Sequence, residues 1–219
     1  MPRAPPLEGR RGLRASPAIG SGIALEVCLE EAARLLAELP YLATPEHVAE
    51  KALELAGLKP GERLVDLGCG DGNVLVVAAE KFGAHAVGVE LNPLLALRAA
   101  ERARRVGVGD RVEVVVGDLY HFDCSRFEVV FCYPSPTASR RLAFKLLSEC
   151  KPGCRIVVHG SPLEGLRPSE VLEVPGFKGQ THKVYLYLAG RWGQRVEGCD
   201  GAGVVAVRGR GERTVAPSA

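Results

Sequence analysis

Residues 64–72 of this 219-residue chain read Leu-Val-Asp-Leu-Gly-Cys-Gly-Asp-Gly. An apolar run comes first, glycine then fills every second position from Gly68 to Gly72, and a helical pattern begins near Asn73. Glycines after a strand allow a sharp turn and let the backbone approach a ligand closely. In open α/β sheets, ligands bind at the carboxyl ends of the strands. The stretch therefore predicts a strand, a ligand-binding turn and a helix.

The same alternation of strand and helix continues on both sides of this stretch. Strands are expected at 64–67, 86–90, 112–116, 128–132, 155–159, 171–174 and 183–188, and helices at 24–39, 45–58, 73–82, 93–106 and 137–150. Apolar runs separated by helices are typical of a parallel sheet covered on both faces. The last two strands follow each other without a helix between them, so they are expected to pair antiparallel at one edge. Thr44 before Pro45 suits a helix N-cap.

Two cofactor classes compete for the glycine-rich turn. A dinucleotide site has G-x-G-x-x-G around a pyrophosphate, but the third position counted from Gly68 is Asn73. Asp66 stands ahead of the glycines and would repel a pyrophosphate. The same acid suits S-adenosylmethionine, whose methionine part carries an ammonium group. The residues therefore disfavour a nicotinamide-dependent oxidoreductase, while a tight turn without any ligand remains the plainer alternative.

Acidic residues also end the next two expected strands. Glu90 is placed to accept hydrogen bonds from two ribose hydroxyls, and Asn92 begins the helix beside it. Asp118 follows the third strand, where its carboxylate can accept from an adenine amino group and the Leu119 backbone N–H can donate to the ring. Acids at the ends of three neighbouring strands form a set that chance rarely supplies.

Together these residues resemble the class I S-adenosylmethionine-dependent methyltransferases. The matching residues are Asp66-x-Gly68-x-Gly70-x-Gly72, Glu90 and Gly117-Asp118, and the resemblance spans about residues 41–189. It implies a Rossmann-like α/β fold, with a seven-stranded, mostly parallel sheet, helices on both faces and an antiparallel last strand. It also implies S-adenosylmethionine as the cofactor, with cofactor-binding residues that include Gly68 and Gly70.

A narrower set of residues is similar to the small archaeal protein-lysine methyltransferases and their mitochondrial relatives. Tyr41-Leu-Ala-Thr44-Pro45, the segment 65–72 and residues 88–93 carry this resemblance, together with His159 and the segment 182–187. In that family the Tyr-x-x-Thr-Pro element lies over the cofactor, which implies that Tyr41 and Thr44 help to close the site. We interpret the histidines at 159 and 182 as structural.

The fourth strand ends in Cys132-Tyr133-Pro134-Ser135-Pro136. Methyltransferases that act on base amino groups often place Asn or Asp before Pro-Pro-Tyr there, and this chain has neither. Tyr133 is the leading catalytic candidate, as the residue that orients an attacking amine, although a packed aromatic ring is an equal alternative. A protein-lysine methyltransferase is the first hypothesis. An RNA or small-molecule methyltransferase and a non-catalytic cofactor-binding module remain open.

Composition excludes other classes. The chain is 47% hydrophobic and 25% charged, which rules out a fully disordered protein, and it has no apolar run long enough to span a membrane. Seven cysteines without a C-x-x-C pair indicate reduced thiols and no metal site. The net charge of +2 arises from basic ends around a mildly acidic middle. We expect a cytoplasmic monomer with one domain over 24–189, a flexible basic extension over 1–23 and a flexible tail over 190–219.

Overall fold

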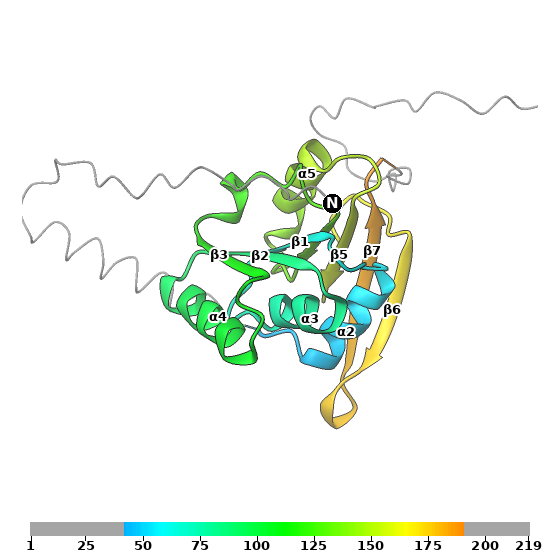
Figure 1. Cartoon of the computed structure of the whole chain (residues 1–219). Coiled ribbons are helices and arrows are strands. Elements are labelled where there is room, and N and C mark those ends of the chain that lie inside the picture. Colours follow the sequence, from blue (N-terminus) through cyan, green and yellow to red (C-terminus); the bar gives the residue numbers. More distant parts are fainter. Residues whose placement is uncertain (1–41, 191–219) are drawn as a thin grey trace, which may run out of the picture.

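The computed structural model describes residues 42–190, which form a seven-stranded sheet with helices on both faces (Figure 1). The strands are β1 (Arg63–Leu67), β2 (His85–Glu90), β3 (Val112–Val116), β4 (Val129–Cys132), β5 (Arg155–His159), β6 (Glu170–Pro175) and β7 (Thr181–Leu188). They lie in the order β3-β2-β1-β4-β5-β7-β6. β7 runs antiparallel to both of its neighbours, β5 and β6, whereas the other neighbouring strands are parallel to one another. The predicted fold class is confirmed, including the antiparallel last strand.

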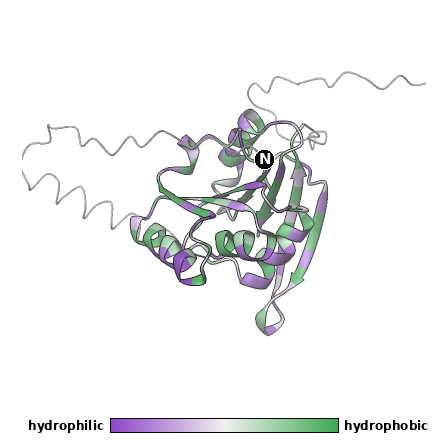
Figure 2. Ribbon diagram, in the orientation of Figure 1, coloured by the Kyte–Doolittle hydropathy of each residue, from purple (hydrophilic) through white to green (hydrophobic). Residues whose placement is uncertain are grey.

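Within residues 42–190, three α-helices cover one face of the sheet and one covers the other (Figure 1). They are α2 (Glu46–Leu55), α3 (Asn73–Phe82) and α4 (Pro93–Val106) on the first face, and α5 (Ser139–Glu149) on the second. Successive residues of a strand point to opposite faces. In β1, Leu64 therefore packs toward α2 and α3, while Val65 packs toward α5. The middle of α3, from Val74 to Ala79, is apolar and buried, and most of this helix is coloured hydrophobic in Figure 2.

The helices begin and end where residues of the right type stand. Asn92 caps α4 by accepting a hydrogen bond from the backbone N–H of Leu94, and Pro93 occupies the first helical position. Gly107 ends the same helix in the left-handed conformation. Two short 3-10 helices, η1 (Leu119–His121) and η2 (Phe177–Gly179), complete the fold. Among the described residues, no helix combines the length and apolar character needed to cross a bilayer.

The order of the strands in the sheet determines where a ligand-binding site is expected. Chain connections from β1 run first to β2 and β3 on one side, and then cross to β4 and β5 on the other. The order of the strands therefore reverses between β1 and β4, and this is where open α/β sheets bind their ligands. Because β7 is antiparallel, the turn that joins it to β6 lies at the end of the sheet where the parallel strands have their carboxyl ends. The helix predicted over 24–39 lies outside the described residues.

Candidate functional site

The glycine-rich turn after β1 is held against β2 by backbone hydrogen bonds. The N–H groups of Gly68 and Cys69 both donate to the carbonyl of Val89. Gly68 has a φ of +88°, a value that favours glycine, and a Cβ atom there would meet no other atom within 4 Å. Gly72 is enclosed instead, because its Cβ would lie 2.8 Å from that of Ala99 in α4. The turn thus needs glycine for conformation at one end and for space at the other.

Glu90 is fixed at the end of β2 by the turn itself. Its two carboxylate oxygens accept from the backbone N–H of Gly70, at 2.9 Å, and from that of Asn92, at 2.8 Å. Each oxygen retains lone pairs for further donors. The carboxylate is therefore oriented in advance, as a site for paired ribose hydroxyls requires. Asn92 acts here through its backbone N–H, since its side-chain oxygen caps α4.

Asp66 is the buried acid of the site. It lies in β1 with 3% of its surface exposed, and it lines a pocket beside Gly68. No hydrogen-bond donor within the described residues reaches its carboxyl group. Burial, and then the charge of Glu90, raise the pKa of Asp66 to about 8. A bound cation would compensate this buried acid, so the position suits the ammonium group of S-adenosylmethionine.

Asp118 and Leu119 lie one strand further along, at the end of β3. The Gly117 N–H donates to the carbonyl of Glu90, which ties this strand end to the previous one. One oxygen of Asp118 accepts from the Tyr120 N–H at 2.8 Å and so caps η1. The other oxygen lies 3.4 Å from Nδ1 of the exposed His121, so a ligand would share this half-exposed carboxylate with both groups. These residues lie outside the pocket that Asp66 lines.

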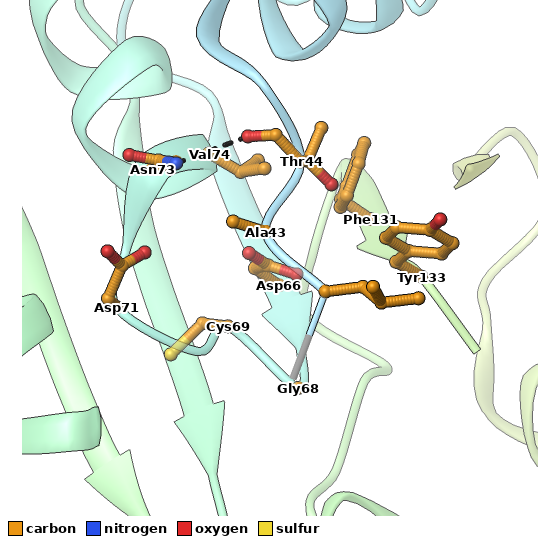
Figure 3. Close-up of a pocket in the computed structure, with 11 residues that line it drawn as sticks. Ala43, Thr44, Asp66, Gly68, Cys69, Asp71, Asn73, Val74, Phe131 and Tyr133 are labelled. Atoms are coloured by element: carbon orange, nitrogen blue, oxygen red, sulfur yellow. Dashed lines mark hydrogen bonds between the residues drawn. The ribbon is translucent and has the colours of Figure 1, made fainter. Parts of the chain in front are cut away.

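The opposite wall of the pocket is aromatic. Figure 3 shows Phe131 and Tyr133 on one side and Asn73 on the other, with Thr44 and Asp66 between them. Phe131 belongs to β4 and Tyr133 directly follows it. The pocket thus joins an acidic end, which fits the cofactor's methionine part, to an aromatic end at the carboxyl edge of β4.

Tyr133 packs against His159, the last residue of β5, with the two rings tilted by 41°. The two ring centroids lie 4.0 Å apart. Gly160 makes room for the ring, because a Cβ atom there would lie 2.5 Å from Tyr133 Cε2. No described residue hydrogen-bonds the Tyr133 hydroxyl group. Tyr133 is therefore both a packed aromatic residue, as the alternative held, and a residue with a polar end at the pocket.

The interpretation of Thr44 as a helix cap was wrong. Helix α2 begins at Glu46, its N-cap residue is Pro45, and no side chain caps it. The Thr44 hydroxyl instead makes a 3.1 Å hydrogen bond to Nδ1 of His159, because the loop before α2 crosses the end of β5. Thr44 does line the pocket. Tyr41, which was expected to help close the site, lies outside the described residues.

Several residues that line the pocket were not predicted as site residues, among them Asn73 and Phe131. Asn73 stands out in the sequence only as the absence of a third glycine, but its side-chain N–H donates to the Thr44 carbonyl at 3.2 Å and ties the loop to α3. Phe131 is expected only as part of an apolar strand, yet it lines the pocket. The signal for both is weak, because each acts through a neighbour that is distant in sequence. Arg102 of α4 further holds the Asn73 side chain.

The residues present fit S-adenosylmethionine, and the fold and site together define a class I S-adenosylmethionine-dependent methyltransferase. The chain is similar to the crystal structure of an RNA methyltransferase from Salinibacter ruber in complex with S-adenosyl-L-homocysteine. The TM-score is 0.63 and the identity 33%, over 67% of this chain and 93% of that one. The model of the ANTKMT methyltransferase domain matches residues 66–170.

Two proteins of similar sequence indicate which methyltransferases within this class the chain resembles. A protein-lysine N-methyltransferase of Saccharolobus islandicus is 37% identical over 69% of this chain and 94% of its own length. The adenine nucleotide translocase lysine N-methyltransferase of Mus musculus is 32% identical over 74% of this chain, and the match spans 68% of the mouse protein. The chain belongs to the family of the Saccharolobus enzyme.

Proposed function

We propose that this methyltransferase transfers methyl groups to the lysine side chains of proteins. When bound, S-adenosylmethionine supplies an electrophilic methyl group on its sulfonium. The proposal is supported by the archaeal relative, which is matched over 94% of its length. The observation in the structure that carries it is the aromatic end of the pocket, formed by Phe131 and Tyr133.

The acidic half of the site binds and orients. Asp66, which lines the pocket, would hold the ammonium group of the methionine part, and Glu90, fixed by two backbone N–H groups, would accept from the ribose hydroxyls. Asp118 and the Leu119 N–H lie at the next strand end, where they suit the adenine. Fixed groups of this kind lose little entropy on binding, so the methyl group is presented in one place.

The aromatic half prepares the amine. A lysine side chain arrives as an ammonium ion and must lose a proton before its nitrogen can attack. Aromatic walls desolvate the charged form and so lower the pKa of a lysine that enters. We propose that the Tyr133 hydroxyl, which no described residue hydrogen-bonds, accepts a hydrogen bond from the amine. The mildly acidic middle of the chain also suits basic, lysine-rich targets better than a polyanion.

RNA is the second candidate acceptor, because the 33% identical Salinibacter ruber protein is described as an RNA methyltransferase. The end of β4 opposes a base amino group as acceptor. Its residues Phe131, Cys132 and Tyr133 include no Asn or Asp to hold a planar amine. That objection does not extend to ribose or carbon acceptors.

The test is to incubate the purified protein with S-adenosylmethionine labelled on the methyl group and with a protein and RNA extract. We expect label on protein, recovered as methyl-lysine after acid hydrolysis and located by mass spectrometry. The Asp66→Asn variant is the control, since it should bind no cofactor. Label that ribonuclease releases would assign RNA as the acceptor. Label in the small-molecule fraction would assign a metabolite, and tight cofactor binding without turnover would indicate a binding module.

A further inference from the structure

A chain of hydrogen bonds leads from the pocket toward the surface through three side chains. Thr44 Oγ1 lies 3.1 Å from Nδ1 of His159, and His159 Nε2 lies 3.0 Å from Nδ1 of His182. His159 is only 1% exposed, whereas His182 is partly exposed. Thr44 is the end that lines the pocket. A hydroxyl group has a single hydrogen. The direction of its hydrogen bond to His159 therefore determines whether Thr44 can donate to a ligand in the pocket or only accept from one.

The inner imidazole is neutral near pH 7. Burial, and then the proximity of His182, lower the pKa of His159 to about 4. A neutral imidazole donates through one nitrogen and accepts through the other. The stable tautomer of free histidine has its hydrogen on Nε2, and with that tautomer in both rings His159 donates to His182. His159 Nδ1 then accepts, so the hydrogen of the Thr44 hydroxyl points at His159.

Packing keeps this arrangement in place. The Tyr133 ring packs against His159 at a tilt of 41°, with centroids 4.0 Å apart, and the His182 ring centroid lies 5.1 Å from that of His159. His159 cannot turn its ring without displacing both. Figure 3 shows the Thr44 hydroxyl on the side of the pocket that Phe131 and Tyr133 line, and its oxygen has unused lone pairs.

We propose that His159 and His182 fix Thr44 as a hydrogen-bond acceptor that orients the amine of the incoming lysine. This inference rests on the proposed lysine methylation. The Thr44 oxygen accepts an N–H of the neutral amine and leaves the nitrogen lone pair free to attack in line. His159 and His182 are positioning residues, since they act through Thr44. An anionic acceptor group finds no hydrogen to bind at this oxygen, so the arrangement selects for donors.

The first test needs no turnover. Nitrogen-15 NMR of the imidazole side chains separates protonated from unprotonated ring nitrogens. We expect His159 to carry its hydrogen on Nε2, with Nδ1 unprotonated, and His182 to show the same tautomer. A hydrogen on His159 Nδ1 would reverse the direction of the whole chain and overturn the proposal, whatever the enzyme methylates.

The second test separates the amine from the cofactor. Thr44→Val removes the hydroxyl at almost constant shape, and we expect kcat/KM for the lysine acceptor to fall about tenfold, the effect of one lost hydrogen bond. The Kd for S-adenosylmethionine should stay within about twofold of the wild-type value. Thr44→Ser should restore most of the rate. An equal loss in cofactor affinity, or no rescue by serine, would place the hydroxyl's role elsewhere.

The third test addresses the outer histidine, which is tolerant of change because it is partly exposed. His182→Phe keeps a ring beside His159 but cannot accept from Nε2, so we expect a several-fold fall in kcat/KM for the acceptor. His47→Phe is the matched control. His47 contacts the His182 ring at 6.2 Å between centroids but lies outside the hydrogen-bond chain. If the two variants lower kcat/KM for the acceptor equally, the hydrogen bond from His159 to His182 does not position Thr44, and the proposal is refuted. Failure of the wild-type protein to label any lysine would instead refute the proposed function.

Discussion

At the scale of single residues, Asp66 shows how binding opposes stability. Its pKa is raised to about 8, above its ordinary value of 3.8. Between these values the folded protein retains a proton that the unfolded chain has lost. The free energy of unfolding must therefore fall as the pH rises from about 4 to about 8, by at most about 1.4 kcal/mol per pH unit from this group. A bound cation removes that penalty.

Replacing the carboxyl group with an amide should separate the two effects. We expect Asp66→Asn to raise the Tm of the cofactor-free protein at pH 8, and to flatten the dependence of Tm on pH between 6 and 8. It should also abolish measurable binding of S-adenosylmethionine in calorimetry. Glu113→Gln, an exposed position on β3, is the control and should change neither quantity. An Asp66→Asn protein that still binds the cofactor would contradict the assignment of the ammonium site.

A substitution at Gly68 tests the part of the pocket that the glycine-rich turn forms. Its φ of +88° disfavours any side chain, and a side chain there projects into open space beside Asp66. Gly68→Arg should abolish cofactor binding and cost about 1–2 kcal/mol of stability through the backbone. Gly57→Arg is matched, because Gly57 also has a positive φ of 61° and open space but follows α2. It should lose similar stability and keep the affinity measured by calorimetry.

The candidate residues whose position could be predicted from sequence spacing are those that stand at the end of a strand. Asp66, Glu90 and Asp118 end neighbouring strands, so the sheet topology alone brings them together. Asn73 and Phe131 are different, because their contacts with the pocket depend on where a distant loop crosses. The type and spacing of residues in the sequence do not show where a distant loop crosses, so these contacts could be identified only from the fold.

At the scale of elements, helices and strands were predictable almost to their ends. The described helices and strands all start and stop within a few residues of the expected bounds, because glycine, proline and cap residues mark them. The cap of α2 was predicted wrongly, although the helix starts within one residue of its expected position. Thr44-Pro45 has the pattern of a cap, but a buried histidine 115 positions away competes for the hydroxyl. A tertiary partner that satisfies a buried polar group outweighs a local preference.

Gly88 shows how closely the turn packs on β2. A Cβ atom there would lie 2.5 Å from Cys69 Sγ and 2.6 Å from Leu75 Cδ1, both in the turn and helix that follow β1. We expect Gly88→Ala to lower the Tm by several degrees, since overpacking costs about 1–3 kcal/mol, and to weaken cofactor binding by displacing the turn. Gly117→Ala, whose Cβ would meet only one atom at 4.0 Å, should leave the Tm unchanged.

At the scale of the whole molecule, the two halves of the sheet, which meet between β1 and β4, are expected to bind different parts of the reaction. The residues assigned to the cofactor lie at the ends of β1, β2 and β3, and we expect the acceptor to bind at the ends of β4, β5 and β7 on the other side of the sheet. Both predictions, the parallel order and the antiparallel last strand, followed from the alternation of helices and strands. Which acceptor the second side binds did not follow, because it depends on side-chain contacts such as that between Tyr133 and His159.

The assembly state is a prediction for the whole chain. Each sheet face is covered by its own helices, so the fold of one chain buries both hydrophobic clusters. We expect a monomer of 23.3 kDa in solution, with or without S-adenosylmethionine. Light scattering coupled to size-exclusion chromatography measures this mass directly. A species of twice that mass that persists on dilution would contradict it.

The reversal of strand order between β1 and β4 has a consequence for inheritance. Every residue assigned to the cofactor, apart from the loop that contains Thr44, lies between positions 66 and 119, whereas the aromatic wall and both histidines of the relay lie between 131 and 182. The gene thus encodes the donor chemistry and the choice of acceptor as two consecutive blocks. A new target can arise by drift or recombination in the second block while the first is inherited intact.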